Sequence, residues 1–572
     1  MRRGRRLLVI FMGVFVVAAA WLWWVKPRQV DMADYAPANS LVYLEGNDPS
    51  KIAQALQNTE AWKLARDLTG ATEQPLQNSW LQQFVAWTGI GPVESVILAR
   101  AQVAVVVTDL GATEESDTLR IKPEGALIID TKTSERRIRP VIDSALKKLA
   151  ELTYGSPVPR SVSIDGVSFT EYVSPDGSRQ IVSVISGSLV IIGNTRQAVQ
   201  SCLAVTQGSA PSLKADTELS RMRFELRGNE ALTFGYVPAG NSARLLSIGL
   251  PLMMGRAPAN SEFQRLIASG ASKVLGSLGW TSRPFKTGIE DRFLISLHPP
   301  VVARLKPVFT SNRVSREVEQ MVPEDVSSIT FYRFEDPLKA WQSLRSSISS
   351  QTDALSAVFF TSLLNTSLSS YGVDNPESFL SAVGAEIITF RLDSNADRSL
   401  LVARVDDEKK LRELLAKTMR VRSTTSQVNQ IEIFENSEGE SGAGFVKGFV
   451  ILGQPADVLK YAQLLKEGGS SSDPNKFKRL TFFASLTSSA NILSYADDSD
   501  RVRNFFSAAQ AAQNLPPVPR NRFDQLLSQL PSAATETSLG ERGLERTTVS
   551  PMGQFSTLLP LLVPPDRAQP SP

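Results

Sequence analysis

The sequence predicts an α+β protein with a single N-terminal transmembrane helix followed by two tandem α+β repeats whose sheets are mainly antiparallel. Three observations support this fold class. A charge-free run of 19 residues lies near the N-terminus. The remainder carries one pattern of residues twice, which indicates a duplicated unit. Short apolar runs and helical periodicities do not alternate strictly, which is typical of α+β rather than βαβ architecture.

Composition narrows the functional classes. The chain has 572 residues, of which 42% are apolar, with one His and one Cys. These values exclude wholesale disorder, a disulfide framework and Cys-cluster or His-pair metal sites. Six of the 61 basic residues precede residue 29, where no acidic residue occurs, leaving 55 basic against 58 acidic residues. The basic character therefore belongs to the N-terminal arm, and neither nucleic-acid binding nor a cofactor is predicted.

Residues 1–6 are predicted to form a basic cytoplasmic arm and residues 7–25 a transmembrane helix. A helix of that length reaches roughly 30 Å, the thickness of the hydrocarbon core. Its expected lipid and interface residues are Leu7, Phe11, Phe15, Trp21, Trp23 and Trp24. The preceding arginines orient the chain so that the bulk lies outside the cytoplasm. A signal peptide cleaved after Ala18–Ala20 is the alternative, but the apolar run continues to Trp24, which favours a retained anchor.

The exported part is predicted to consist of a first repeat at residues 31–300, a linker at 301–315 and a second repeat at 316–563. Residues 564–572 are Pro-rich and expected to be disordered. The strand Val103–Val107 matches Glu386–Phe390, and Gly288-Ile-Glu290 matches Gly543-Leu-Glu545. Other matched pairs are Tyr35–Pro49 with Met321–Pro337, Leu189–Gly193 with Phe449–Gly453, and Tyr236 with Tyr495.

Local signals place several elements. Asp48-Pro49 and Asp336-Pro337 predict helix starts, with Asp as N-cap and Pro at the first helical position. Gln180–Ile185 and Leu189–Ile192 flank a Ser-Gly-Ser turn and predict a hairpin.

Two matched amphipathic helices are also expected. The first has its buried stripe at Ile138, Val141, Ile142, Ala145, Leu146 and Leu149. The second has Asp406 as N-cap and its stripe at Leu411, Leu414, Leu415 and Met419.

Catalytic and metal candidates are weak. Cys202 falls on the apolar side of a helix, and His298 has no nucleophile motif to pair with. Two short stretches match sequence motifs of penicillin-recognising serine enzymes: Ser144-Ala-Leu-Lys147 and Lys286-Thr-Gly288. Ser144, however, is expected on the solvent-exposed face of its helix.

The carboxylates Asp497, Asp498 and Asp500 do not have EF-hand spacing, and helix capping explains them without a metal. We therefore predict no catalytic, cofactor or metal site.

One segment differs between the repeats in a way that points to a contact. Leu250, Leu252, Met253 and Met254 are apolar, whereas the aligned second-repeat segment ends in Gln510, Gln513 and Asn514. Methionine suits adaptable apolar contacts. We expect the four first-repeat residues to contact a membrane, a lipid or a protein partner; the alternative is that they pack into the seam between the repeats.

The stretches Pro37–Pro49, Gly89–Val107 and Gly187–Gly193 resemble a bacterial family called domain of unknown function 3352. The resemblance implies an N-terminal span, repeated strand–Gly–helix units and a location in the bacterial inner membrane with the bulk in the periplasm. It implies no catalytic or binding residue, because the family has no assigned activity.

The sequence analysis leaves three functional classes. The first is a non-catalytic, membrane-anchored periplasmic protein that binds an envelope partner or scaffolds an assembly. The second is a carrier or sensor of a lipid or other apolar ligand. The third is a cryptic hydrolase.

Overall fold

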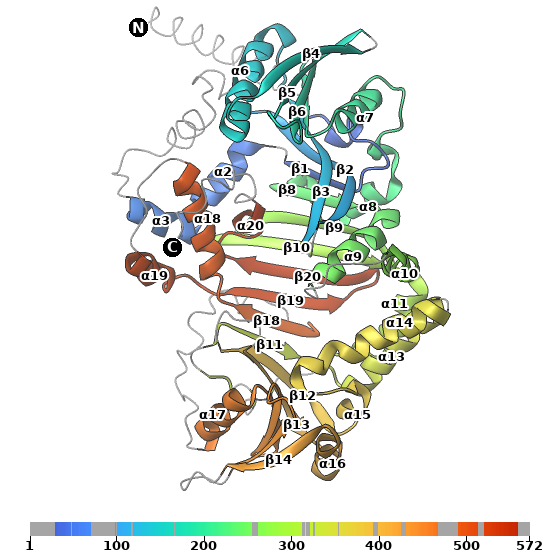
Figure 1. Ribbon diagram of the computed structural model, residues 1–572, viewed down its shortest axis with the longest axis vertical. Helices are drawn as coiled ribbons and strands as arrows, with labels where there is room; N and C mark the ends of the chain where they lie inside the picture. The colour runs from blue at the N-terminus through green and yellow to red at the C-terminus, as the bar shows by residue number, and fades with distance from the viewer. Residues whose placement is uncertain are drawn as a thin grey trace, which may run out of the picture.

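The computed structural model describes most of the chain from residue 29 to residue 558 (Figure 1). Residues outside the description are 1–28, 47, 70–97, 99, 116–117, 165, 254–260, single residues and short gaps within 312–325, 353, 393–397, 425–430, 467–489, 513–519 and 559–572. The described part is α+β, as predicted, and is built on one large antiparallel sheet.

The strands fall into two sets along the chain. Those of the first half are β1 (Val42–Gly46), β2 (Gln102–Glu115), β3 (Thr118–Asp130), β4 (Val158–Ile164), β5 (Val167–Val173), β6 (Gln180–Ser186), β7 (Leu189–Gly193), β8 (Thr233–Val237), β9 (Leu275–Phe285) and β10 (Gly288–Leu297). Those of the second half are β11 (Ser328–Tyr332), β12 (Val383–Arg391), β13 (Ser399–Val405), β14 (Met419–Thr424), β15 (Ile431–Asn436), β16 (Gly442–Val446), β17 (Phe449–Gly453), β18 (Ile492–Ala496), β19 (Ala533–Leu539) and β20 (Gly543–Ser550).

Helices occur between the strands of both halves. In the first half they are η1 (Met32–Asp34), α2 (Pro49–Gln57), α3 (Glu60–Thr69), α6 (Glu135–Tyr154), α7 (Arg196–Thr206), η2 (Leu213–Ala215), α8 (Thr217–Glu225), η3 (Gly228–Glu230), α9 (Ala239–Met253), α10 (Ser261–Ala271) and α11 (Pro299–Leu305). In the second half they are α13 (Pro337–Gln351), α14 (Ala354–Asn365), η4 (Thr366–Tyr371), α15 (Pro376–Leu380), α16 (Glu408–Thr418), α17 (Pro455–Lys466), α18 (Ser499–Ala512), α19 (Arg520–Leu527) and α20 (Phe555–Leu558).

The strands pair in the same order in both halves. In the first half the sheet runs β4-β5-β6-β7-β3-β2-β1-β8-β9-β10. In the second half it runs β14-β15-β16-β17-β13-β12-β11-β18-β19-β20. The antiparallel pair β10–β20 joins the two halves into one sheet that runs the length of the molecule (Figure 1).

Two helix clusters flank the β10–β20 seam, one on each side in Figure 1. On one side α2 and α3 pack against α18, α19 and α20, and the ring of Trp62 lies 6.4 Å from that of Phe505 and 6.0 Å from that of Phe506. On the other side α10 contacts α14 and α11 contacts α13. The α10–α14 approach is close enough that a Cβ on Gly270 would overlap the ring of Phe360. Each half therefore contributes helices to both clusters.

Several local predictions are confirmed. The side chain of Asp48 accepts the N–H groups of Ser50 and Lys51 at the start of α2, and Asp336 accepts that of Lys339 at the start of α13. The expected hairpin is β6–β7. Asp497 accepts the N–H of Ser499 at the start of α18, as the capping interpretation predicts.

Other local predictions need correction. The N-cap of α16 is Asp407 rather than Asp406, whose carboxylate lies against Gly384. On α6 the buried residues recur every four positions, at Ile138, Ile142, Leu146 and Ala150. Leu149 therefore lies off the buried stripe and is 39% exposed.

The stretch predicted as a linker begins inside α11. Val301, Val302 and Leu305 of α11 are buried, and this helix contacts α13 of the second half. These apolar residues make the connection part of the packed seam.

Candidate functional site

The most elaborate polar arrangement in the described structure surrounds α8. This helix follows η2, and its N-cap Asp216 accepts the N–H of Glu218. Leu219 and Met222 anchor one face in the core of the first half. The remaining faces present charged side chains toward two separate parts of the molecule. We call this arrangement the α8 site and define it by Asp31, Glu45, Glu218, Arg223, Glu225 and Arg542.

The first part is the segment that follows the predicted membrane helix. The side chain of Gln102 makes two hydrogen bonds of 2.8 Å with the backbone of Val30. The Val30 N–H donates to Gln102 Oε1, and Gln102 Nε2 donates to the Val30 carbonyl. Beyond them Met32, Ala33 and Ala36 are completely buried. This segment is therefore packed into the body of the first half.

Arg223 links this segment to the core strand β1. Its guanidinium donates to Asp31 at 3.1 Å and to Glu45 at 3.1 Å. The guanidinium also lies over the ring of Phe234 at 5.3 Å. The hydroxyl of Tyr43 donates to the same Glu45 carboxylate at 2.6 Å. One arginine thus connects the beginning of the described chain to the middle of the sheet.

Burial controls the electrostatics of this group. Glu45 is 3% exposed and Tyr43 is completely buried. Burial raises the pKa of Glu45, whereas Arg223 and the Tyr43 hydroxyl act in the opposite direction. Burial and the adjacent carboxylate raise the pKa of Tyr43 well above its ordinary value. A buried carboxylate needs both partners, because its unpaired form is costly in a low-dielectric interior.

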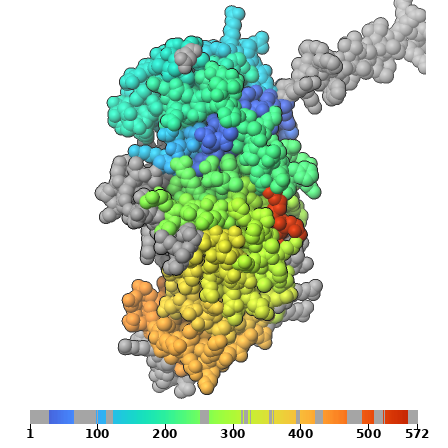
Figure 2. Space-filling model, turned by 90° about the vertical axis from the view of Figure 1, so that its right-hand side faces the viewer, coloured from blue at the N-terminus to red at the C-terminus, as the bar shows by residue number. Residues whose placement is uncertain are grey.

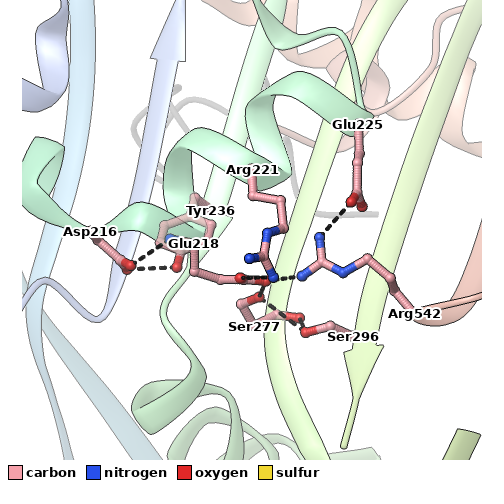
Figure 3. A network of polar contacts seen from close by, with 8 residues as sticks. All are labelled: Asp216, Glu218, Arg221, Glu225, Tyr236, Ser277, Ser296 and Arg542. Carbon is pink, nitrogen blue, oxygen red and sulfur yellow. Dashed lines mark hydrogen bonds and ion pairs between the residues drawn. The ribbon is translucent and has the colours of Figure 1, made fainter. Parts of the chain in front are cut away.

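The second part is the turn between β19 and β20. Figure 3 shows Arg542 of this turn reaching α8, where its guanidinium pairs with Glu218 and with Glu225, the latter at 2.7 Å. Ser277 of β9 donates to Glu218 at 3.0 Å. The backbone carbonyl of Arg542 also accepts the N–H of Leu297 at 2.8 Å. These contacts attach the second half to the helix that holds the N-terminal segment.

A further buried carboxylate lies on β10 near the seam. Asp291 accepts a hydrogen bond from Ser282 at 2.5 Å and one from the N–H of Gln554 at 2.9 Å. Burial raises its pKa to about 6, and these two hydrogen bonds oppose the shift. The second contact holds the segment before α20. Asp291 therefore participates in the connection between the halves.

The predicted contact site is only partly covered by the structure. Leu250 is half-buried on α9. Leu252 and Met253 end that helix with side chains outside the described residues, and Met254 lies entirely outside them. The choice between a seam and an exposed contact stays open.

The predicted anchor residues Leu7, Phe11, Phe15, Trp21, Trp23 and Trp24 all lie outside the described residues. Within the described part, no helix has the length and apolar character needed to cross a membrane.

The weak catalytic candidates fall in separate elements. Cys202 is buried on α7, and burial raises the pKa of its thiol to about 12. His298 precedes α11, with its ring 3.0 Å from the carbonyl of Ser272. Ser144 is exposed on α6, and Lys286 occupies the β9–β10 turn. Among the described residues, no group of three or more His, Cys, Asp or Glu side chains is arranged to hold a metal.

Sequence analysis missed the α8 site. One signal was present, because Glu45 shares its strand face with Tyr43 at a spacing of two, so a buried Tyr43 implies an inward carboxylate. Arg223 and Arg542 lie 178 and 497 residues from Glu45. Nothing local in the sequence indicates that Arg223 pairs with Glu45 or that Arg542 reaches α8.

Comparisons with known proteins do not identify a family. No protein-family model and no curated protein matches the chain. Two solved structures of TP0453, crystal forms III and IV, each align with a TM-score of 0.24 and 10% identity. They cover 50% and 49% of this chain and 90% and 85% of theirs. The resemblance to domain of unknown function 3352 stays a prediction.

Proposed function

We propose that the chain is a non-catalytic, membrane-anchored protein of the bacterial envelope whose exported bulk acts as a binding or scaffolding module. The observation that carries the proposal is the α8 site. A segment that only retains a protein near a membrane needs no fixed contacts, whereas Val30–Ala36 is held by Gln102, by Arg223 and by its own buried side chains. Such docking suits a protein that must present one orientation from the membrane surface.

The proposal includes two tandem copies of one α+β unit. The identical strand order of the halves supports it. Gly193 and Gly453 end β7 and β17, and Tyr236 and Tyr495 occupy β8 and β18.

The seam has the symmetry that such a pair of copies implies. Gly288 and Gly543 are matched residues of the two halves and lie 255 positions apart. At the same offset, Arg292 matches Thr547. These two residues pair directly in β10–β20. Equivalent positions meet in this way at the two-fold axis of an isologous interface.

Membrane attachment is tested by flotation of the full-length protein with vesicles, followed by extraction at alkaline pH. The proposal predicts that the protein floats and resists extraction. Reporter fusions after Val30 are expected to be active only outside the cytoplasm. Release by alkaline extraction, or cytoplasmic reporter activity, would contradict the anchored topology.

The binding role is tested by mild purification of the native protein and mass spectrometry of co-eluting material. We expect a reproducible protein partner in wild type and in the matched variants Cys202→Ala and His298→Ala. A stoichiometric lipid without a protein partner would instead favour the apolar-ligand carrier. Loss of partner or activity in a folded His298→Ala variant would favour an enzyme.

A further inference from the structure

The exposed side chain of Phe224 stands out on α8. It is 84% exposed, whereas the other large apolar side chains that are exposed in the described structure lie between 38% and 45%. A single exposed aromatic residue can be incidental on a protein surface. Its location therefore decides whether it carries meaning.

Phe224 belongs to the helix that lies against the first described residues of the chain. The preceding residue, Arg223, holds Asp31, and Lys214 just before α8 holds Asp34 at 2.7 Å. The N–H of Leu213 donates to the carbonyl of Ala36 at 2.8 Å. In Figure 2 the dark-blue N-terminal residues lie beside green residues on the same face of the molecule. α8 thus borders the start of the described chain.

The length of the intervening chain limits how far this face can be from the bilayer. Five residues, 26–30, lie between Val25 at the predicted end of the span and the docked Asp31, which makes six Cα–Cα steps. Even fully extended, they reach about 20 Å. Because Asp31 is fixed by Arg223, the folded body cannot move farther from the membrane without breaking the α8 site.

Two exposed arginines flank Phe224 and could bind lipid phosphates. Arg221 and Arg227, three residues to either side, are both exposed. Arg221 pairs with Glu218 at 3.4 Å, but that carboxylate is shared with Arg542, and Glu225 is also paired with Arg542. Glu230 is also exposed, three residues beyond Arg227, so the exposed charges around Phe224 balance and the two arginines are what would meet lipid phosphates. Phe on a surface helix can insert at the boundary between headgroups and acyl chains, and nearby arginines are attracted to anionic lipids.

We propose that Phe224, with Arg221 and Arg227, contacts the anionic phospholipid surface of the membrane in which the chain is anchored. This inference rests on the anchored topology proposed above. It adds a second attachment point, so that α8 and the transmembrane helix together fix the orientation of the exported body. The apolar ring enters the headgroup region while the two guanidinium groups bind phosphates.

The test is a depth measurement by spin labelling of the full-length protein in vesicles of phosphatidylethanolamine and phosphatidylglycerol. Phe224→Cys is compared with Leu464→Cys, an exposed position on α17, which lies in the second half and far below α8 in Figure 1. The native Cys202 is buried, and labelling of the wild-type chain controls for it. Collisions of each label with oxygen, which partitions into lipid, and with a water-soluble nickel complex are measured.

The label at 224 is expected to collide more with oxygen and less with nickel than the label at 464. Adding Arg221→Gln and Arg227→Gln should shift the label at 224 toward water. Equal nickel accessibility at 224 and 464 in protein that floats with the vesicles would overturn the membrane contact alone. Protein that does not float would overturn the anchored topology, and this inference with it.

Discussion

The two halves differ in chemistry at equivalent positions of their central strands. In β1 Tyr43 faces Tyr236 of β8, and in β11 Ile329 faces Tyr495 of β18. Two residues further along, Glu45 in the first half corresponds to Phe331 in the second. Glu45 is bound by Arg223 and Tyr43, whereas Phe331 packs its ring edge-on against Tyr495 at 6.3 Å. The same backbone thus holds a buried ion pair in one half and an apolar cluster in the other.

This difference shows that the polar group is not needed to build the fold. Replacing a buried ion pair by well-packed apolar residues is often neutral or stabilising, since desolvation offsets the attraction. The second half already uses the apolar solution. The arginine of the first-half ion pair also holds Asp31, next to the predicted membrane helix. The second half follows no such helix. We infer that the network specifies position rather than supplying stability.

The largest effect is expected when the acidic residue of the first half is introduced at the equivalent position of the second half. Phe331→Glu places a carboxylate at a position that is 4% exposed and removes a buried ring. The combined loss should reach about 5 kcal/mol or more of the free energy of unfolding. Denaturant unfolding in detergent micelles measures it. A loss below about 1 kcal/mol would show that the second half tolerates the charge and that the two interiors are alike.

The next effect concerns the arginine itself. Arg223→Ala leaves Glu45 buried without its cation and should cost about 4 kcal/mol. The double variant Glu45→Phe/Arg223→Leu imitates the second half and should recover most of that loss in the same assay. If the double variant were as unstable as Arg223→Ala, the ion pair would be a source of stability and the interpretation of the comparison would be wrong.

The seam offers a comparison with a pH dependence. Asp291 lies three residues after Gly288, and Arg546 lies three residues after the matched Gly543. The two residues therefore occupy equivalent positions of the two halves. Burial raises the pKa of Asp291 from 3.8 to about 6, so its contribution to stability is complete below about pH 4 and is lost as pH rises through about 6. The change amounts to ~3 kcal/mol.

Asp291→Asn cannot titrate, so its Tm relative to wild type should rise between about pH 4 and pH 7. Thermal unfolding at several pH values in the same detergent measures this difference. A Tm difference that is constant with pH would contradict the shifted carboxyl group.

The smallest effect is expected at the link between α8 and the second half. Arg542→Ala removes ion pairs to Glu218 and Glu225, whose side chains are 26% and 31% exposed. Partial exposure limits the cost to roughly 1 kcal/mol. Lys306→Ala, which removes a more exposed pair with Glu541 across the same seam, is the control and should change stability by less than about 0.5 kcal/mol. Equal losses would indicate that α8 has no special part in joining the halves.

Local features of the fold followed from the sequence because short-range chemistry determines them. The caps at Asp48 and Asp336 and the β6–β7 hairpin each depend on residues within a few positions. The burial of Cys202 followed from helical periodicity in the same way.

Long-range features did not follow from the sequence. The pairing of β10 with β20 and the packing of α2 and α3 against α18, α19 and α20 join residues more than 200 positions apart. The α8 site could not be predicted for the same reason, because no local sequence pattern marks Arg223 or Arg542 as members of it. Even a correct repeat alignment could not show that the two units share one sheet.

The central claim is that Val30–Ala36 is a fixed part of the first half rather than a loose tether. Hydrogen–deuterium exchange of the full-length protein in nanodiscs tests it directly. Peptides covering this segment should be protected to the same degree as β1, because Met32 is buried and the N–H of Val30 is bonded to Gln102. In Glu45→Phe/Arg223→Leu this segment should lose protection while β1 keeps it. Rapid exchange of the segment in the wild-type protein would contradict the account.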